Sequence, residues 1–400
     1  MSISPAVLVV ALTLLLGLQP LSTDLYLPAL PALTTTFGGT MVQAQLTLSS
    51  LLLAFGASQL IWGPISDRVG RRPILIIGLS LYTLSAIGSS FSFSMESLIA
   101  WRVLQGVAMG AAIMAARALV RDCFDDPIMA AKVMSQGLSG LGVVACVSTP
   151  IGGLLTDLFG WRIALLFLAV VGSVALGLIL LKIDETLRAP KLDALRPNVL
   201  LHTWKSILAN HTFWSFALLQ SATYAGLFVF LATSSFVFIQ ILSLSSSVYG
   251  LLMFTMSASY ISGTLLCRRL LLRYSVQRTV AIGGVFALVG GTLMGVLALA
   301  GIQAVWSIML PLYIYMIGHG INQPCAQSGA MGPFPRSAGA ATALSSFIMV
   351  IFSFFIGQWL GVRMDGTVMP TALGIWVSGV AVAVVAWGFV VRIPLPPKTA

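Results

Sequence analysis

The chain has 400 residues, of which 58% are hydrophobic and only 8% are charged, and its formal net charge is +10. A soluble domain carries about 25% charged residues, so this chain lacks the polar side chains needed to cover its surface in water. Its Lys and Arg residues lie in short connections rather than on one basic helix, which argues against nucleic acid as a partner and favours the lipid bilayer.

Runs of about 20 mostly apolar residues predict twelve membrane-spanning helices. They lie approximately at 5–32, 42–64, 73–92, 99–120, 132–156, 162–182, 213–240, 248–267, 279–300, 305–332, 338–361 and 369–391. The first run lacks a preceding basic residue, so we interpret it as a span and not as a cleavable signal. The expected fold is an all-α membrane protein with an N-terminal six-helix half at 1–183, a cytoplasmic linker at 184–212 and a C-terminal six-helix half at 213–400.

The first span contains an acid among prolines. Asp24 shares a helix face with Pro20, Pro28 and Pro31. Because Pro28 has no N–H, the carbonyl of Asp24 loses its helical partner. An intramembrane acid and an unpaired carbonyl both require an interior, wet or protein-covered surface, and burial would favour proton uptake by the carboxylate. We therefore predict that Asp24 carries a proton, and the alternative is a structural ion pair between helices.

The connection after the second span reads GPISDRVGRR. Its distinctive residues are Gly63, Asp67, Arg68, Gly70, Arg71 and Arg72. The glycines permit a sharp cytoplasmic turn, Asp67 could lie at the positive end of a neighbouring helix, and the arginines could pair with Asp122 below the fourth span. Such contacts would form in one conformation and open in another. We expect a gating loop here, with a plain basic loop as the alternative.

The fourth span carries a buried cation and a polar stripe. Arg102, Gln105 and Met109 recur with a period of 3.6 residues, and Gly106 begins a GxxxG pattern that permits close helix approach. A guanidinium at this depth needs an acid, carbonyl groups or water. Asp24 is the only acid well inside a predicted span, so a direct or water-bridged pair with Arg102 is one hypothesis. An Arg102 side chain that extends to the outer interface is the other.

The second half offers polar faces in place of charges. The candidate cavity-lining residues are Gln105 and Met109 from the fourth span, Gln220 and Tyr224 from the seventh, and His319, Asn322 and Gln323 from the tenth. Amide and aromatic groups suit partly apolar small molecules. His319 could relay protons, but we favour a hydrogen-bonded place in a cavity wall. Helix packing alone is the alternative for this set.

Charge along the chain predicts the topology. If the N-terminus is cytoplasmic, every Lys and Arg except Arg102, Arg162 and Arg363 falls in a cytoplasmic loop or helix end. This asymmetry follows the positive-inside rule and predicts that both termini are cytoplasmic.

The sequence contains no motif that indicates catalysis. It lacks HExxH, GxSxG, SxxK and a Walker-type GxxxxGK[ST] segment, so we expect no enzyme activity, no cofactor and transport driven by a proton gradient. The four cysteines have no metal-ligand spacing. We expect them to be small core residues, neither a disulfide set nor a metal site.

Several of these segments are similar to motifs of the major facilitator superfamily. GPISDRVGRR resembles its loop signature, and RVLQG at Arg102 resembles its fourth-helix arginine motif. STPIGG, with Pro150, Gly152 and Gly153, resembles its antiporter motif. PLSTDLYLPALP and GHGINQPCAQSGAMGPFP resemble the bicyclomycin and chloramphenicol resistance (Bcr/CflA) branch of drug:proton antiporters. The similarity extends from the first span through the eleventh.

This resemblance implies multidrug or metabolite efflux across a bacterial inner membrane by alternating access. In related exporters a first-helix acid handles the proton and the motif arginine assists, which implies these roles for Asp24 and Arg102. The chain departs from the antiporter motif at Thr149, where Gly usually precedes the proline. It also lacks the further first-helix acid found in some exporters of cations, so the resemblance does not imply cationic drugs.

We therefore expect a monomeric antiporter whose partners are protons, a small organic molecule and the bilayer. A dedicated exporter of a metabolite such as an amino acid is the nearest alternative. A non-transporting receptor or scaffold is a more distant one, because the short loops leave little room for a soluble partner and Asp24 would have no purpose.

Overall fold

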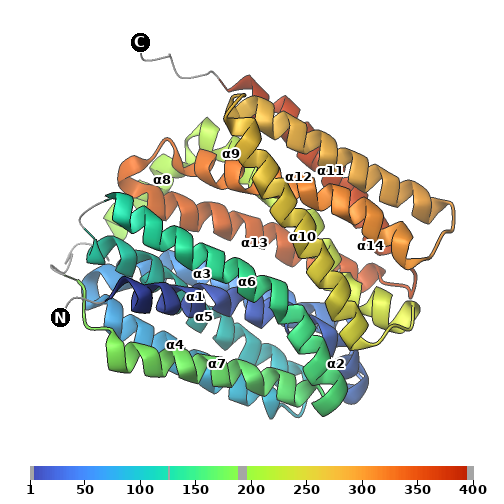
Figure 1. Ribbon diagram of the computed structural model, residues 1–400, viewed down its shortest axis with the longest axis horizontal. Helices are drawn as coiled ribbons and strands as arrows, with labels where there is room; N and C mark the ends of the chain where they lie inside the picture. Colours follow the sequence, from blue (N-terminus) through green and yellow to red (C-terminus); the bar gives the residue numbers. More distant parts are fainter. Residues whose placement is uncertain (1–3, 125–126, 188–195, 394–400) are drawn as a thin grey trace. The chain divides into compact units, whose positions relative to one another are not determined.

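A computed structural model describes residues 4–124, 127–187 and 196–393. Within these ranges the chain is helical and contains no strand (Figure 1). Eleven of the described helices are long and apolar enough to cross a membrane. Part of the predicted linker, including Arg188 and Lys191, lies outside the described residues. The chain divides into two compact units.

Unit 1 comprises Met1–His202, Phe238–Phe254 and Gly357–Val362. Its helices are α1 (Pro5–Asp24), η1 (Leu27–Ala29), α2 (Leu30–Phe37), α3 (Met41–Val69), α4 (Arg71–Ser90), α5 (Met95–Cys123), α6 (Pro127–Phe159) and α7 (Trp161–Lys182). Helix α1 packs against α5 and α6, and α5 packs against α3 and α4. Helices α4 and α7 lie side by side (Figure 1). These contacts place α1 and α5, which carry Asp24 and Arg102, next to each other.

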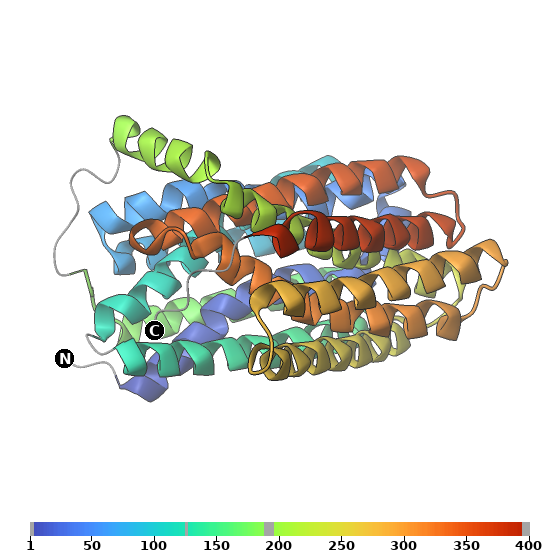
Figure 2. The same cartoon turned by 90° about the horizontal axis from the view of Figure 1, so that it is seen from above.

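Unit 2 comprises Thr203–Val237, Thr255–Ile356 and Arg363–Ala400. Its elements are α9 (His211–Ser235), the π-helix η3 (Phe236–Ile241), α10 (Ser246–Leu271), α11 (Val276–Leu299), α12 (Val305–Met331), η4 (Pro335–Ser337), α13 (Ala338–Arg363), α14 (Met369–Gly388) and η5 (Val390–Arg392). Helix α11 lies between α12 and α14, and both of these also contact α9 (Figure 2).

The boundary between the units passes through several helices, α10 and α13 among them. The first residues of α10, up to Phe254, and the segment Gly357–Val362 of α13 group with unit 1. The division of the chain into two repeated halves of six helices therefore remains a prediction. The predicted linker also contains a short helix that the sequence pattern did not reveal, α8 (Pro197–Leu208).

Helix α12 has 27 residues, long enough to span a bilayer, but it is not among the eleven apolar candidates. His319, Asn322 and Gln323 lie in its middle and lower its hydropathy, and it contains two prolines. The twelve-span count therefore remains a prediction.

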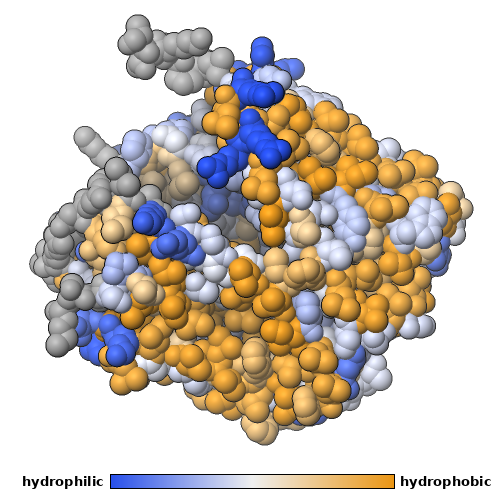
Figure 3. Space-filling model, in the orientation of Figure 1, coloured by the Kyte–Doolittle hydropathy of each residue, from blue (hydrophilic) through white to orange (hydrophobic). Residues whose placement is uncertain are grey.

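The outward faces of the helices are apolar. Figure 3 shows hydrophobic residues over most of the visible face, with hydrophilic residues in a few groups. Leu154, Val174, Leu251 and Phe355 are examples of large hydrophobic side chains that are exposed along predicted spans. Helices that are apolar on their outer as well as their inner faces are suited to lipid, not water.

Candidate functional site

The first span is broken where the acid lies. Helix α1 ends at Asp24, and a 3-10 turn at Leu27–Ala29 precedes α2. The break confirms the prediction from Pro28, whose ring removes the N–H that the carbonyl of Asp24 would need. The Thr23 hydroxyl lies 2.8 Å from Asp24 Oδ1 and 3.0 Å from the carbonyl oxygen of Gln19. With a single hydrogen, it donates to one of these acceptors at a time.

Arg102 is fully buried, so the hypothesis of an outward-reaching side chain is wrong. Its Nη2 donates to the Ser22 carbonyl at 2.6 Å and its Nη1 to Gln105 Oε1 at 2.8 Å. Its guanidinium carbon also lies 4.2 Å from the centre of the Tyr26 ring. Among the described residues Arg102 forms no ion pair with Asp24, so a direct pair is not formed.

The contacts of Arg102 explain why a cation is tolerated there. A helix leaves its last carbonyl groups without intrahelical partners, and these carry the negative end of the helix dipole. Ser22 lies in the last turn of α1, and Tyr26 lies in the turn that follows Asp24. Arg102 thus binds the chain on both sides of Asp24 and caps the end of α1.

Two tyrosines complete this arrangement, and the sequence pattern did not single them out. The Tyr26 hydroxyl donates to Thr47 Oγ1 on α3 at 2.7 Å. The Tyr82 hydroxyl of α4 shares a 2.8 Å hydrogen bond with Ser22 Oγ. Both tyrosines are fully buried. The broken end of α1 is therefore held by polar contacts from α3, α4 and α5.

Glycines bring α5 close to α3, as the GxxxG pattern predicted. A Cβ atom on Gly106 would overlap the carbonyl oxygen of Leu51, and one on Gly110 would overlap Ser58 Oγ. The backbones are therefore in contact along this stretch. Met109 between these glycines and Gln105 beside them are fully buried.

A second polar group lies inside unit 2. Nε2 of Gln220 on α9 lies 3.6 Å from Sδ of Met349 on α13, and Nε2 of Gln323 on α12 lies 4.0 Å from the same sulfur. The Oε1 atoms of both glutamines are buried and have no hydrogen-bond partner among the described residues. Asn322 is fully buried, and neither of its amide atoms has a partner there. Tyr224 is buried as well.

His319 is buried and hydrogen-bonded inside unit 2, and a cavity beside it remains a prediction. Its Nδ1 lies 3.0 Å from the Thr223 carbonyl oxygen and 3.1 Å from Thr223 Oγ1. Its ring lies 5.5 Å from that of Tyr260 on α10, centre to centre. Because a carbonyl only accepts, Nδ1 carries the hydrogen when it bonds to Thr223 O.

The predicted gating loop is shorter than expected. Helix α3 continues through Pro64 to Val69, so Gly63, Asp67 and Arg68 are helical, and the turn consists of Gly70 alone. Pro64 does not end α3, because a packed membrane helix tolerates a proline. Gly70 does, because it adopts φ 121°, a conformation that other residues rarely adopt. The turn therefore depends on Gly70.

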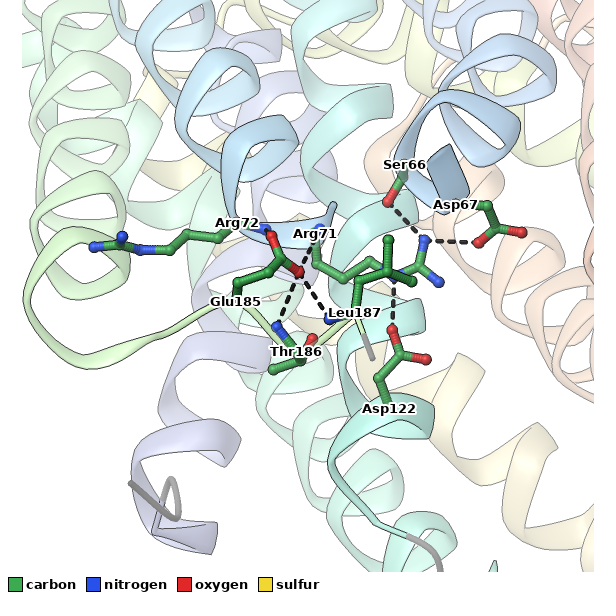
Figure 4. A network of polar contacts seen from close by, with 8 residues as sticks. All are labelled: Ser66, Asp67, Arg71, Arg72, Asp122, Glu185, Thr186 and Leu187. Atoms are coloured by element: carbon green, nitrogen blue, oxygen red, sulfur yellow. Dashed lines mark hydrogen bonds and ion pairs between the residues drawn. The ribbon is translucent and has the colours of Figure 1, made fainter. Parts of the chain in front are cut away.

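The predicted pairing of the arginines with Asp122 is confirmed for Arg71. Figure 4 shows the Arg71 side chain between two carboxylates, with Nη1 2.7 Å from Asp67 Oδ1 and Nε 2.7 Å from Asp122 Oδ2. The Arg72 Nη2 group instead donates to the Leu180 carbonyl at 3.1 Å, and Arg68 is exposed.

The carboxylate at the start of α4 comes from Glu185, which the sequence pattern did not indicate. Its Oε1 accepts from the backbone N–H of Arg71 at 2.9 Å, and its Oε2 accepts from that of Arg72 at 3.1 Å (Figure 4). An acid at a helix N-terminus satisfies unpaired N–H groups and favours the helix dipole. Glu185 thereby ties the segment after α7 to the turn at Gly70.

The residues of the antiporter motif form a packing surface on α6. A Cβ atom on Gly152 would overlap the carbonyl oxygen of Leu25, directly beside Asp24, and one on Gly153 would overlap that of Ser246. A Cβ atom on Gly250 of α10 would lie 2.8 Å from Cα of Pro150. Helix α6 thus touches both the break in α1 and the start of α10, inside unit 1.

A further acid on α6, Asp157, holds the start of α10. Its Oδ2 accepts from the backbone N–H of Ser247 at 2.8 Å and from the Ser247 hydroxyl at 2.6 Å. The signal for this contact in the sequence is weak, because an acid near a helix end has many possible partners.

Comparisons with known proteins agree with this geometry. The family model of the Major Facilitator Superfamily matches residues 12–357. Multidrug resistance protein D of Escherichia coli K12 is 31% identical over 84% of each chain. A chloramphenicol resistance protein of Pseudomonas aeruginosa is 27% identical over 82% of this chain and 77% of its own length. These names fit the branch that the first-span and tenth-span segments resemble.

A solved structure supports the fold independently. A D-xylose–proton symporter superimposes with a TM-score of 0.76 over 95% of this chain and 97% of its own, at 16% identity. Its likeness concerns the fold alone. The candidate spans and the bacterial relatives make this protein a multi-pass protein of a bacterial inner membrane and a transporter, not an enzyme. From the family match and these relatives together, the chain belongs to the Major Facilitator Superfamily.

Proposed function

We propose that this transporter exports small organic molecules in exchange for protons by alternating access. The observation that carries the proposal is the place of Asp24, at the break in α1, where Thr23 alone among the described residues donates to its carboxylate. Asp67, Asp122 and Asp157 also lie in described helices, but Arg71 pairs with the first two, and Ser247 donates two hydrogen bonds to the third. An intramembrane acid without a cation beside it is suited to take up and release a proton.

The Thr23 hydroxyl supports this role. When Asp24 is ionised, Thr23 donates to Oδ1; when Asp24 is protonated, the same hydroxyl can turn to the Gln19 carbonyl 3.0 Å away. Both states of the acid therefore leave the hydroxyl hydrogen-bonded. Arg102 acts in the proposal as a positioning residue, because it holds Ser22 and Tyr26 on either side of Asp24.

The exported compound contacts the amide groups of unit 2. Gln220 and Gln323 converge on Met349, and their buried oxygens are available to a ligand that donates hydrogen bonds. Residues 203–400 contain a single acid, Asp365, which follows α13. No carboxylate in that part of the chain can bind a cationic drug inside the membrane. Neutral compounds with polar groups, such as the chloramphenicol for which a relative is named, are the first candidates.

The same proposal includes the topology. Helix α12 is the twelfth span, both termini are cytoplasmic, and the protein works as a monomer with two halves of six helices. The small number of basic residues on the opposite side, Arg162 and Arg363, supports this orientation.

The test uses purified protein in liposomes that enclose a pH-sensitive dye. Chloramphenicol and a panel of neutral and cationic drugs are added, and proton movement is compared for wild type, Asp24→Asn and Asp365→Asn. The last variant makes the same chemical change at an exposed loop acid. We expect compound-dependent proton flux in wild type and Asp365→Asn and none in Asp24→Asn.

Two results would contradict the proposal in different ways. Compound-dependent flux that survives in Asp24→Asn would place the proton elsewhere, with His319 the next residue to substitute. No flux with any drug, but flux with an amino acid or another metabolite, would identify the dedicated metabolite exporter instead.

A further inference from the structure

Two cysteines that are distant in sequence are neighbours inside unit 2. Cys267 on α10 and Cys325 on α12 have their Sγ atoms 3.6 Å apart, and their side chains are almost completely buried. Cys123 and Cys146 are half-buried. Nothing in the sequence pattern indicates this pair, because the two thiols are 58 residues apart.

Glycines explain why the thiols can meet. A Cβ atom on Gly263 of α10 would overlap the carbonyl oxygen of Ile317, and one on Gly320 of α12 would lie 2.5 Å from that of Tyr260. The two backbones therefore touch. Cys267 lies one helical turn after Gly263 on the same face, so it remains at the contact between the helices.

We propose that Cys267 and Cys325 form an oxidisable dithiol site that closes to a disulfide and ties α10 to α12. The two thiols lose two hydrogens and two electrons as the S–S bond forms, and a small two-electron oxidant that enters the membrane takes them up. Diamide does so at its N=N bond, which becomes a hydrazine. A disulfide is about 2.05 Å long, so the sulfurs need to approach by about 1.5 Å, within reach of side-chain rotation.

The position of the disulfide gives it a mechanical consequence. Pro324 lies inside α12 directly before Cys325 and removes a backbone hydrogen bond, which makes this a point where the helix can bend. A disulfide at Cys325 would fix the helix to α10 at that point. His319 and Gln323 lie within the preceding two turns. Oxidation therefore restrains the helix that carries part of the polar group of unit 2.

The first experiment examines the chemistry and requires no substrate. Full-length protein in lipid is treated with diamide, and free thiols and disulfide-linked peptides are identified by mass spectrometry. We expect loss of two thiols, a linked peptide that contains Cys267 and Cys325, and full reversal by dithiothreitol. The link disappears in Cys267→Ala and persists in the control Cys146→Ala. Thiols that stay free, or links through Cys123, Cys146 or a second chain, would overturn the proposal.

The second experiment examines the consequence, and this part rests on the proposed export function. Exchange is measured before and after diamide in wild type and in Cys267→Ala/Cys325→Ala. We expect a several-fold slower rate in oxidised wild type, recovery with dithiothreitol and no change in the double variant. A linked protein that transports at the unchanged rate would refute the restraint. Because the link is detected without any substrate, failure of this site and failure of the export function are separable.

Discussion

Arg102 and Arg162 make the same ring contact in opposite environments. Each guanidinium carbon lies 4.2 Å from the centre of an aromatic ring, that of Tyr26 for Arg102 and that of Trp161 for Arg162. Arg102 is fully buried and also donates to the Ser22 carbonyl, whereas Arg162 is exposed. Desolvation strengthens both cation–π contacts and hydrogen bonds. The two arginines therefore form a matched pair for measuring how much burial adds to the free energy of unfolding.

We predict that Arg102→Gln lowers the free energy of unfolding by about 1–3 kcal/mol, because buried acceptors on α1 lose their donor. Arg162→Gln should cause a clearly smaller loss, since water replaces its contacts. Denaturant or thermal unfolding of both variants in the same detergent measures the difference. Equal losses would show that the cap on α1 contributes nothing beyond a surface contact.

A double-mutant cycle separates the cap from an ion pair. Arg102 binds the backbone around Asp24 and not its carboxylate, so the effects of Asp24→Asn and Arg102→Gln on unfolding should add to within about 0.5 kcal/mol. A coupling well above that value would mean that the two side chains interact directly in the membrane.

At the scale of single elements, the glycines of α6 determine how closely it approaches α1. A Cβ atom on Gly152 would overlap the Leu25 carbonyl oxygen, whereas a Cβ atom on Gly142 of the same helix would meet nothing within 4 Å. We predict that Gly152→Ala destabilises the protein by about 1–3 kcal/mol and slows exchange, because the break beside Asp24 is displaced.

Gly142→Ala is the matched control for that change. It adds the same methyl group to the same helix without a clash, so it should be neutral or stabilise the helix by up to about 1 kcal/mol. Thermal unfolding and the dye assay on both variants check the prediction. If the two variants behave alike, the close approach of α6 to α1 has no functional role.

The elements differ in how far sequence alone could predict them. The break in α1 followed from Pro28, because a missing N–H is a local property. The bond between Arg71 and Asp122 followed from charge and helix ends. The end of α3 was predicted at residue 64, because Gly63 and the charges after it were interpreted as a cytoplasmic turn, but the helix continues through Pro64 to Val69.

Other contacts could not be predicted because they depend on which helices are neighbours. Glu185 caps α4 only because the segment after α7 passes its N-terminus. Arg102 meets Ser22 because α5 packs beside α1, and Cys267 meets Cys325 because glycines let α10 and α12 approach closely. A single sequence specifies the residue types at such contacts but not their partners.

For the molecule as a whole, the acids are distributed unequally. The part of the chain up to residue 202 holds all the acids except Asp365, and residues 203–400 contribute neutral amides and His319 to their interior. Under the proposed function, unit 1 handles the proton and unit 2 binds the compound. Such a division removes the need for a compound to compete with the proton at one carboxylate, so coupling must act through the conformation of the protein.

Whether α12 crosses the membrane determines the topology of the helices after it. The connection after α13 reports which case holds. If α12 is a span, the connection after α13, which contains Asp365, lies outside the cell; if it is not, the same connection lies in the cytoplasm. The connection between α11 and α12, which contains Gln303, lies outside in both cases. Asp365 and Gln303 are both exposed, so each can be replaced by a reactive cysteine.

We predict that Asp365→Cys and Gln303→Cys, each in a variant whose four native cysteines are replaced by serine, react with a membrane-impermeant maleimide on intact cells. Arg273→Cys, on the connection between α10 and α11, should react only after the membrane is opened. An Asp365→Cys variant that behaves like Arg273→Cys would exclude α12 as a span and would reverse the side of the C-terminus. Labelling at all three sites in intact cells would indicate leaky membranes, so membrane integrity is checked beforehand with an impermeant dye. In intact cells, the comparison between Asp365→Cys and Gln303→Cys then decides the topology.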